Sequence, residues 1–280
     1  MAFKIRKFGR RFADAWYEID RRCRSSRDVV VISYPKSGRT WLRFMLEQAN
    51  VRLMYDHAGA KNKLALTFEE ISAEVSAWQQ HRIVFLFRDP RDTVVSSYFE
   101  ATKRLQERYR FAGSLREFVF DRRYGLEKIA RYNLHWLESL HTSEAGLSVA
   151  YEDLHSATAD EIKRVIEFAV RRVPTPRKIE EAVRAGRFDN MRRVETALNG
   201  KMNERNKLGG GIQGDVESLK TRRGVVNGWT GYFNAEEQQQ INDVLNGLNY
   251  FERVRLVHPF VKLQGQRTVG CLAANAGTAN

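Results

Sequence analysis

The chain has 280 residues, of which 42% are hydrophobic, so it can bury a substantial core. No run approaches the roughly 20 apolar residues of a membrane span, and two cysteines, Cys23 and Cys271, exclude a disulfide scaffold or a cysteine-rich metal site. The formal charge of +13 favours an anionic partner: nucleic acid, an anionic membrane, an acidic polysaccharide or a charged nucleotide. The two cysteines favour a reducing cytoplasm, and because the basic residues are scattered along the chain, we expect no binding to nucleic acid.

The N-terminal residues 1–28 are basic and irregularly amphipathic. Large apolar side chains recur there at helical spacing: Phe8, Phe12, Trp16 and Ile19. This pattern predicts a basic helical extension that packs on the main body. The alternative is an interfacial helix, which would give the protein peripheral contact with a membrane. The main domain is predicted over residues 29–260, followed by a tail over 261–280 that has little to bury.

Buried strands and helices alternate along the main domain. Uninterrupted apolar runs predict strands at Val29–Ile32, Ile83–Phe87 and Leu147–Tyr151. Helices are predicted to begin near Trp41 and Pro90 and to span Leu115–Phe120, Leu126–Leu140, Glu161–Val170, Ile179–Ala185 and, last, Ala235–Leu248. The glycine-rich segment Asn199–Gly214 is predicted to be a mobile loop. The order predicts an α/β fold, a single P-loop NTPase-like domain with a central parallel sheet flanked by helices.

A candidate phosphate-binding loop, Ser33–Trp41, follows the first strand and leads into a helix. In this setting the backbone N–H groups of the turn and of the helix N-terminus converge on one point, which suits an anion. Aligned with the nucleotide-binding pattern G-x-x-x-x-G-K-[ST], the loop has Arg39 at the lysine position, and its own lysine is displaced to Lys36. A P-loop nucleotide or small-molecule kinase is therefore one interpretation, although its motif is incomplete.

The same loop resembles the 5'-phosphosulfate-binding loop of cytosolic-type sulfotransferases, Y-P-K-S-G-T-T-W. Seven of eight positions from Tyr34 to Trp41 agree, and Arg39 replaces the first threonine. The resemblance implies 3'-phosphoadenosine-5'-phosphosulfate (PAPS) as donor and 3'-phosphoadenosine-5'-phosphate (PAP) as product. It implies that Lys36 contacts the bridging oxygen and the sulfuryl group, where an ammonium can stabilise charge on the leaving phosphate. The residues implied to hold the 5'-phosphate and the adenine are Ser37, Gly38, Arg39, Thr40 and Trp41.

A donor with a 3'-phosphate needs a second anion site. Arg88 directly follows the second strand and Ser96 lies eight residues later, which resembles the family's 3'-phosphate motif R-x-x-x-D-x-x-x-S. Arg88 is expected at the carboxyl end of its strand, where α/β sheets bind ligands. An alternative would make Asp89 a magnesium ligand at the end of a Walker B strand. Pro90 beside it favours Asp89 as a helix N-cap instead.

Three further segments resemble the rest of the family's donor site. Arg222-Arg223-Gly224 is similar to the family's R-K-G phosphate segment, in which side chains and backbone both donate. Tyr151 begins a segment similar to Y-E-D-L, whose tyrosine lies by the adenine, and Phe188 lies in one similar to S-F-x-x-M, whose phenylalanine lies on the other face. The resemblance as a whole covers residues 29–250, and it indicates a bacterial member of the family.

The acceptor hydroxyl must lose a proton, and in the family a histidine between the phosphate loop and the 3'-phosphate strand accepts it. His57 and His81 both lie in this interval. His57 is the predicted base, because its small-residue loop resembles the histidine-glycine loop of bacterial sulfotransferases, whereas His81 is expected at the far end of the second strand. The remaining histidines are interpreted as structural, because no metal-ligand spacing links them and no metal is expected: His135, His141, His155 and His258.

Together the motifs predict a PAPS-dependent sulfotransferase. The expected acceptor is a hydroxyl, or less readily an amine, on a small molecule, a saccharide or a glycolipid. Two alternatives remain: a P-loop kinase, and a non-catalytic polyanion-binding protein whose case rests on net charge alone. The missing Walker lysine and the Arg88–Ser96 pair argue against the kinase, and Lys36 with a candidate base argues against the binder. No pattern predicts the oligomeric state.

Overall fold

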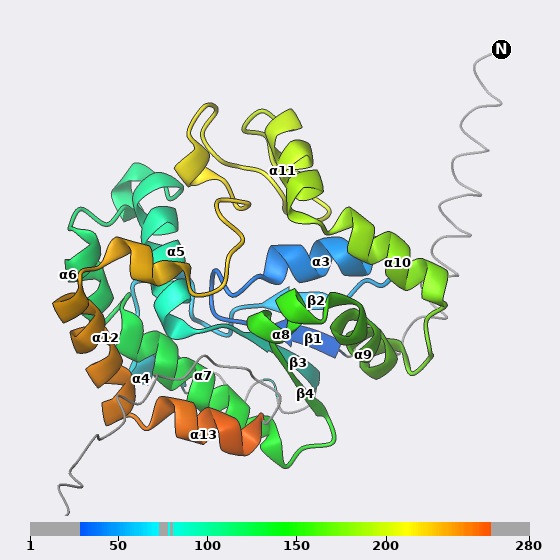
Figure 1. The fold of residues 1–280 in the computed structure, drawn as a ribbon, viewed down its shortest axis with the longest axis horizontal. Helices are drawn as coiled ribbons and strands as arrows, with labels where there is room; N and C mark the ends of the chain where they lie inside the picture. Colours follow the sequence, from blue (N-terminus) through cyan, green and yellow to red (C-terminus); the bar gives the residue numbers. More distant parts are fainter. Residues whose placement is uncertain (1–28, 73–77, 79–80, 259–280) are drawn as a thin grey trace, which may run out of the picture.

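The computed structural model describes residues 29–72, 78 and 81–258, so the predictions for residues 1–28 and for the tail lie outside the described residues (Figure 1). In chain order the elements are β1 (Val29–Ile32), α3 (Arg39–Gln48), β2 (Met54–Asp56), η1 (Asn62–Leu64), α4 (Phe68–Ser72), β3 (Arg82–Phe87), α5 (Pro90–Lys103), η3 (Glu107–Tyr109), α6 (Leu115–Phe120), α7 (Leu126–His141), β4 (Gly146–Ala150), α8 (Tyr151–Ser156), α9 (Thr158–Val170), α10 (Pro176–Ala185), α11 (Phe188–Ala197), η4 (Val216–Ser218), η5 (Gly228–Tyr232), α12 (Ala235–Gly247) and α13 (Tyr250–Val257).

The described strands form one parallel sheet in the order β2-β1-β3-β4, which confirms the predicted central parallel sheet. Val31 of β1 pairs with Tyr55 of β2 on one side and with Val84 of β3 on the other. The chain passes from β1 through α3 to β2, and only then returns to β3 on the opposite side of β1. This order places a topological switch point between β1 and β3, where the carboxyl ends of the strands leave a crevice for a ligand.

Helices cover both faces of the sheet (Figure 1). Successive side chains of a strand point to opposite faces, so β1 sends Val30 and Ile32 into a core shared with α5, α7, α12 and α13. Val29 and Val31 enter a second core shared with α3, α9 and α10. All four side chains are fully buried. Burial on both faces explains why the strand is an uninterrupted apolar run.

The predicted start of α5 is confirmed. The Asp89 carboxylate accepts the Arg91 backbone N–H at 2.8 Å, and Pro90 is the first residue of the helix. The same carboxylate pairs with the Arg91 guanidinium at 2.6 Å. Asp89 is therefore a helix cap and an ion-pair partner, which fixes the direction in which the chain leaves β3.

Several element predictions are wrong or incomplete. Tyr151 begins α8 and is not part of the third predicted strand, because β4 ends at Ala150. The helix α12 is not the last: Asn249, in the left-handed region with φ 50°, separates it from α13, which buries Tyr250 and Val254. Strand β2 and helix α11 were not predicted. β2 has only three residues, and α11 buries only Met191 and Glu195, so neither has a clear apolar period.

The segment 199–214 is irregular, as predicted, but it is tied to the domain. Met202 and Gly209 form an isolated antiparallel bridge. Arg104, the residue directly after α5, donates to the carbonyl of Gly209 at 2.9 Å and to that of Ser218 in η4 at 2.7 Å. The guanidinium thus ties both this segment and η4 to the end of α5. The mobility of the segment stays a prediction.

Candidate active site

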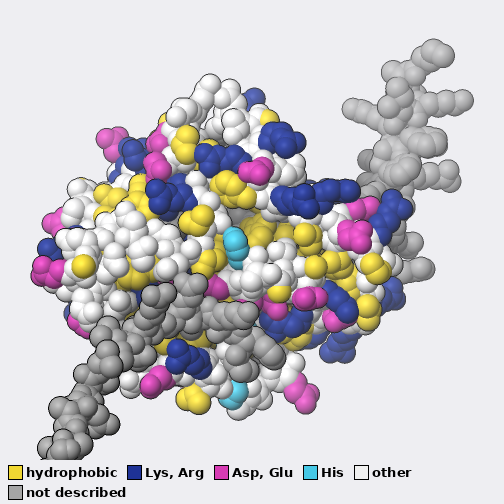
Figure 2. Space-filling model, in the orientation of Figure 1, with side chains coloured by type: hydrophobic (Ala, Val, Ile, Leu, Met, Phe, Trp, Pro, Cys, Tyr) yellow, Lys and Arg dark blue, Asp and Glu magenta, His cyan; other side chains and the backbone are white. Residues whose placement is uncertain are grey.

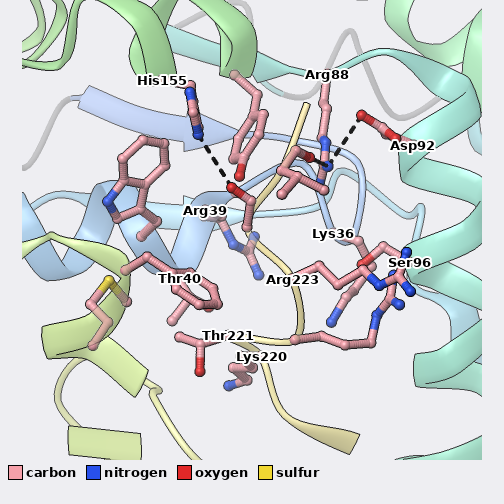
Figure 3. Close-up of a pocket in the computed structure, with 18 of the residues that line it drawn as sticks. Lys36, Arg39, Thr40, Arg88, Asp92, Ser96, His155, Lys220, Thr221 and Arg223 are labelled. Atoms are coloured by element: carbon pink, nitrogen blue, oxygen red, sulfur yellow. Dashed lines mark hydrogen bonds and ion pairs between the residues drawn. The ribbon is translucent and has the colours of Figure 1, made fainter. Parts of the chain in front are cut away.

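A cavity of about 370 Å³ is lined by the loops that follow β1 and β3, at the switch point of the sheet (Figure 3). Its walls also include parts of α5, α8, α11 and the segment 220–232. All but one of the predicted site residues line it: Lys36, Gly38, Arg39, Thr40, Trp41, His57, Arg88, Ser96, Tyr151, Phe188, Arg222, Arg223 and Gly224. The exception, Ser37, is fully buried beneath the loop. Motifs from distant parts of the chain therefore meet in one place.

The phosphate loop turns through two left-handed residues, Lys36 with φ 74° and Gly38 with φ 97°. A Cβ atom at Gly38 would lie 2.6 Å from the Tyr151 ring, so both backbone and packing require glycine there. A lysine with positive φ is uncommon, and its backbone is strained. Strained residues of this kind occur often at ligand-binding sites. The strained turn directs the Lys36 side chain into the cavity, 3.9 Å from a carboxylate oxygen of Glu100.

The loop carries buried hydrogen-bond donors that have no partner among the described residues. They are the Ser37 hydroxyl and Nη1 of Arg39. Among the described residues no side chain caps the N-terminus of α3, although the Trp41 N–H donates to the Gly38 carbonyl at 2.9 Å. Buried polar groups are normally hydrogen-bonded, and an anion at the helix N-terminus would satisfy this set. The chemistry of the loop therefore fits a phosphate or sulfate group.

The electrostatic environment of Lys36 also suits an anion. Burial lowers the pKa of Lys36; the Glu100 carboxylate opposes this shift, and the guanidinium groups of Arg104 and Arg222 add to it. Negative charge beside Lys36 would therefore favour its protonated form. At a larger scale, Lys and Arg side chains gather over α10 and α11 on the face drawn in Figure 2.

Arg88 occupies the carboxyl end of β3 and is held in a fixed direction. Its Nη2 donates to the Val225 carbonyl at 2.8 Å and lies 3.3 Å from Oδ2 of Asp92 (Figure 3). The guanidinium also stacks over the Tyr151 ring at 4.2 Å. Nε of Arg88 is buried without a partner among the described residues. This fixed donor and Ser96 of α5 both line the same cavity as the phosphate loop.

Asp92 anchors the segment that follows Gly224. Its two carboxylate oxygens accept the backbone N–H groups of Asn227 at 2.8 Å and Trp229 at 2.9 Å. Sequence reasoning left the role of Asp92 open, because its partners lie 135 and 137 residues away. The carboxylate thus joins Arg88, which directly follows β3, to the segment that carries Arg222 and Arg223.

We predict that Asp92→Ala lowers the free energy of unfolding by about 1–3 kcal/mol, because it leaves buried N–H groups unpaired. Urea unfolding would measure the change. Asp243→Ala is the matched control, since that exposed carboxylate accepts a side-chain bond from Gln239 on the same helix, α12. Equal unfolding free energies for the two variants would show that Asp92 is not the anchor.

Aromatic side chains line the side of the cavity between α3, α8 and α11. The ring centroids of Trp41 and Tyr151 lie 5.5 Å apart at 63°. Nε1 of Trp41 donates to the Gly186 carbonyl at 2.8 Å, which fixes the indole. His155 joins this wall, with its ring 6.2 Å from Trp41 and its Nε2 3.2 Å from the Gly224 carbonyl oxygen. His155 was interpreted as structural, but its place one helical turn after Tyr151 puts both on the same face of α8.

His57 lies in the loop after β2 with both ring nitrogens engaged. Nδ1 is 2.7 Å from the Ser33 carbonyl oxygen, so it carries the proton and donates. Nε2 is 2.5 Å from Nη2 of Arg39 and therefore accepts from the guanidinium. Burial and the charge of Arg39 hold the pKa of His57 well below its usual value, against the opposing effect of the Ser33 bond. The imidazole is neutral, and the lone pair on Nε2 belongs to the only ring nitrogen that can accept a proton.

His81 is placed differently. It directly precedes β3, at the end of the strand opposite to Arg88, and its ring lies 5.7 Å from Trp78. It does not line the cavity. The prediction that His81 lies at the far end of the strand is confirmed.

Other charged side chains of the cavity were not assigned a role from the sequence. Glu100 follows Ser96 by one turn of α5, and its other oxygen accepts from Asn62 at 2.9 Å. Burial lowers the pKa of Lys220 to about 7, and the neighbouring cations Arg104 and Lys36 add to this shift. The sequence signal for Glu100 was its position four residues after Ser96, which places both side chains on the same face of α5.

Metal sites and membrane-spanning helices can be assessed over the part of the chain that the structure describes. Over residues 29–72, 78 and 81–258, no three His, Cys, Asp or Glu side chains come together as a metal site. In the same ranges, no helix combines the length and the apolar character that crossing a membrane requires.

Comparison with known proteins identifies the family. The model of the sulfotransferase domain matches residues 72–256. Flavonol 3-sulfotransferase of Flaveria bidentis is 23% identical over an alignment of 260 residues, which covers 78% of this chain and 80% of that protein. Cytosolic sulfotransferase 7 of Arabidopsis thaliana is 24% identical over 257 residues, covering 77% of this chain and 76% of that protein.

Solved structures agree in fold. The mouse sulfotransferase SULT7A1, complexed with PAP, superposes with a TM-score of 0.60 at 19% identity, over 84% of this chain and 89% of that one. A retinol dehydratase in complex with androsterone and PAP gives a TM-score of 0.55 at 17% identity, over 82% and 81%. These likenesses, the cavity at the switch point and the family match over most of the domain lead to one conclusion: the chain belongs to the sulfotransferase domain family.

Proposed function

We propose that the enzyme transfers the sulfuryl group of PAPS to an acceptor hydroxyl. The observation that carries this proposal is the meeting of two anion-binding regions and an aromatic wall in one cavity. One region is the phosphate loop, and the other is formed by Arg88 and Ser96 with the Arg222–Gly224 segment. A donor with a 5'-phosphosulfate, an adenine and a 3'-phosphate has matching groups, and the similar structures of the mouse sulfotransferase and the retinol dehydratase contain PAP.

The unpartnered donors support a placement of the two ends of the ligand. The Ser37 hydroxyl, Nη1 of Arg39 and the N-terminus of α3 would hold the 5'-phosphosulfate, together with Gly38 and Thr40. Nε of Arg88, Ser96 and Arg223 would hold the 3'-phosphate. Trp41, Tyr151 and Phe188 would enclose the adenine. Arg222 pairs with Glu217 at 3.3 Å and contributes mainly by shaping the segment that presents Arg223.

When bound, the donor supplies a sulfuryl group whose bond to the acceptor oxygen forms as its bond to the 5'-phosphate oxygen breaks. Lys36 would place its ammonium where negative charge develops on the leaving phosphate. Nε2 of His57 would take the proton of the acceptor hydroxyl, because Nδ1 already carries a proton held by Ser33. Lys36 would thus act on the leaving phosphate oxygen, and His57 on the attacking acceptor oxygen.

A thermal-shift comparison of PAP, ATP with Mg²⁺ and an oligonucleotide tests this function. A ligand at 100 times its Kd stabilises the native state by about 2.7 kcal/mol. We expect a shift with PAP. A shift with ATP and Mg²⁺ but none with PAP would favour the kinase, and a shift with the oligonucleotide alone would favour a polyanion-binding protein.

Gly224 gives a sharper structural test of the donor site. It has φ 64°, and a Cβ atom there would lie 2.4 Å from the Phe188 ring. Gly224→Ala is therefore expected to displace Phe188 and the Arg222–Arg223 segment and to weaken PAP binding at least tenfold, or about 1.4 kcal/mol. Calorimetric titration measures it. Gly231→Ala, where nothing lies within 4 Å of the added methyl, is the control, and equal affinities in the two variants would contradict the assignment.

The class of acceptor and the cellular location are also proposed. Three of the plant relatives are named for flavonols, which favours a hydroxyl on a small molecule, with saccharide and glycolipid hydroxyls and amines as alternatives. A cytoplasmic location is proposed because one relative is named a cytosolic sulfotransferase. Peripheral membrane contact through residues 1–28 remains part of the proposal. Release of PAP in the presence of each acceptor class would rank them.

A further inference from the structure

The hydrogen bonds of His57 conflict with its proposed role as a base. A general base needs a free lone pair within reach of the acceptor proton. Nδ1 is protonated and donates to the Ser33 carbonyl, so only Nε2 is left. The lone pair of Nε2 is already taken by the Arg39 guanidinium at 2.5 Å. In this arrangement His57 has no nitrogen with which to accept a proton.

Arg39 connects this histidine to the phosphate loop. It is the first residue of α3, so its backbone lies at the helix N-terminus, where an anion is favoured. Its Nη2 contacts His57, whereas its Nη1 is buried and has no partner among the described residues. The same guanidinium therefore has one nitrogen on the base and another that is buried without a partner among the described residues. Arg39 is also the position at which the loop departs from Y-P-K-S-G-T-T-W.

We infer that Arg39 is a positioning residue that makes His57 available as a base only when an anion occupies the phosphate loop. This inference rests on the proposed function. A guanidinium binds phosphate or sulfate through charge-assisted, often bidentate bonds, which are stronger than its bond to a neutral imidazole nitrogen. An anion in the loop therefore competes for Arg39 and releases Nε2. The acceptor proton can then pass to Nε2, while the imidazole stays oriented by Ser33.

The charges around His57 determine the direction of the effect. Charged and titratable groups surround His57 and Arg39 on several elements. They are Arg39 and Arg43 of α3, Asp56 of β2, Lys61 of the loop after β2, Glu100 of α5 and Tyr132 of α7. Arg39 is the largest cationic influence on His57, ahead of Lys61 and Arg43. Withdrawal of Arg39 toward an anion would therefore raise the pKa of His57 toward its ordinary value. The free enzyme has a neutral but blocked imidazole, and the donor-bound enzyme has one that can accept a proton.

The test is an NMR titration of the full chain labelled with ¹⁵N-histidine, with His57→Gln to assign the signal. In the free wild-type protein, His57 should titrate well below its ordinary pKa. Saturation with PAP, which carries the 5'-phosphate, should raise this pKa by about one unit or more, a tenfold change in proton affinity. Arg39→Thr should show the raised pKa without PAP, and PAP should then raise it by less than in the wild-type protein, because only the direct effect of the phosphate charge remains. Arg39→Lys, which keeps a cation near the ring, should restore part of the dependence on PAP.

The outcomes separate this inference from the proposed function. If calorimetry shows that PAP binds and the pKa of His57 stays unchanged, the coupling through Arg39 is wrong while the donor site stands. If PAP does not bind at all, the proposed function itself fails. An unchanged His57 pKa in the PAP-bound wild-type protein would overturn the inference without any variant, so a poorly folded Arg39→Thr protein would not prevent the test. A purely structural Arg39 would give the same PAP-dependent shift in the wild-type and variant proteins, because the phosphate charge alone would then cause it.

Discussion

Lys36→Ala is expected to reduce turnover of PAPS by about 10²–10³-fold, the usual cost of removing one group that stabilises transition-state charge. The Lys36 side chain lies in the cavity, and the partner identified for it is Glu100 at 3.9 Å. Because its side chain lines the cavity, its removal should leave the fold intact. Formation of PAP measures turnover, and urea unfolding verifies stability.

The loss in Lys36→Ala should appear mainly in kcat, because charge on the leaving phosphate develops in the transition state. Lys103→Ala is the matched control on the neighbouring helix α5. Lys103 is half-exposed, and its contact with Asp215 is 3.8 Å long. A Lys36→Ala enzyme with the turnover of the control would remove Lys36 from the mechanism.

His57→Ala is expected to lower turnover by about 10²–10⁴-fold, the range for loss of a positioned general base. His57→Gln should lose as much, although its amide can still bond to Ser33 and Arg39, because glutamine cannot take up a proton. His81→Ala is the matched control from the same interval of sequence, outside the cavity. Near wild-type turnover in His57→Ala would exclude His57 as the base and leave Glu100 as the next group to test.

The pH profile gives the same prediction an independent readout. A base acts in its deprotonated form, so activity is present above its pKa and is lost as the pH falls through it. Because burial and Arg39 lower the pKa of His57, the acid limb of kcat/KM should lie below pH 6.5, the ordinary histidine value. His57→Gln should lack this limb. An acid limb that persists in His57→Gln would belong to another group.

The core of the fold could be predicted from local patterns. Strands β1 and β3 are buried on both faces and therefore appear as apolar runs, and Asp89-Pro90 marks a helix start by its own chemistry. Strand β2 could not be predicted, because Met54–Asp56 is short and lies at the edge of the sheet, where less apolar surface is buried. Its pairing with β1 is a long-range contact, which local periodicity does not encode.

The site was predictable where a motif carries its own chemistry. Lys36, Arg88 and Gly224 were found from such motifs, and all three line the cavity. The anchoring of the 222–229 segment by Asp92 was not predictable, because it depends on hydrogen bonds between residues more than 130 positions apart. The bond between Arg39 and His57 is of the same kind. It joins the N-terminus of α3 to the loop after β2 and becomes visible only when both are placed in space.

Calorimetric titration of the full chain with PAP and with adenosine 5'-phosphate tests most directly whether the donor site has two separated anion-binding regions. The two ligands differ only in the 3'-phosphate. We expect PAP to bind at least tenfold more tightly, or about 1.4 kcal/mol, and we expect Arg88→Ala to remove most of the difference. Equal affinity for the two nucleotides in the wild-type protein would contradict a second anion site at Arg88.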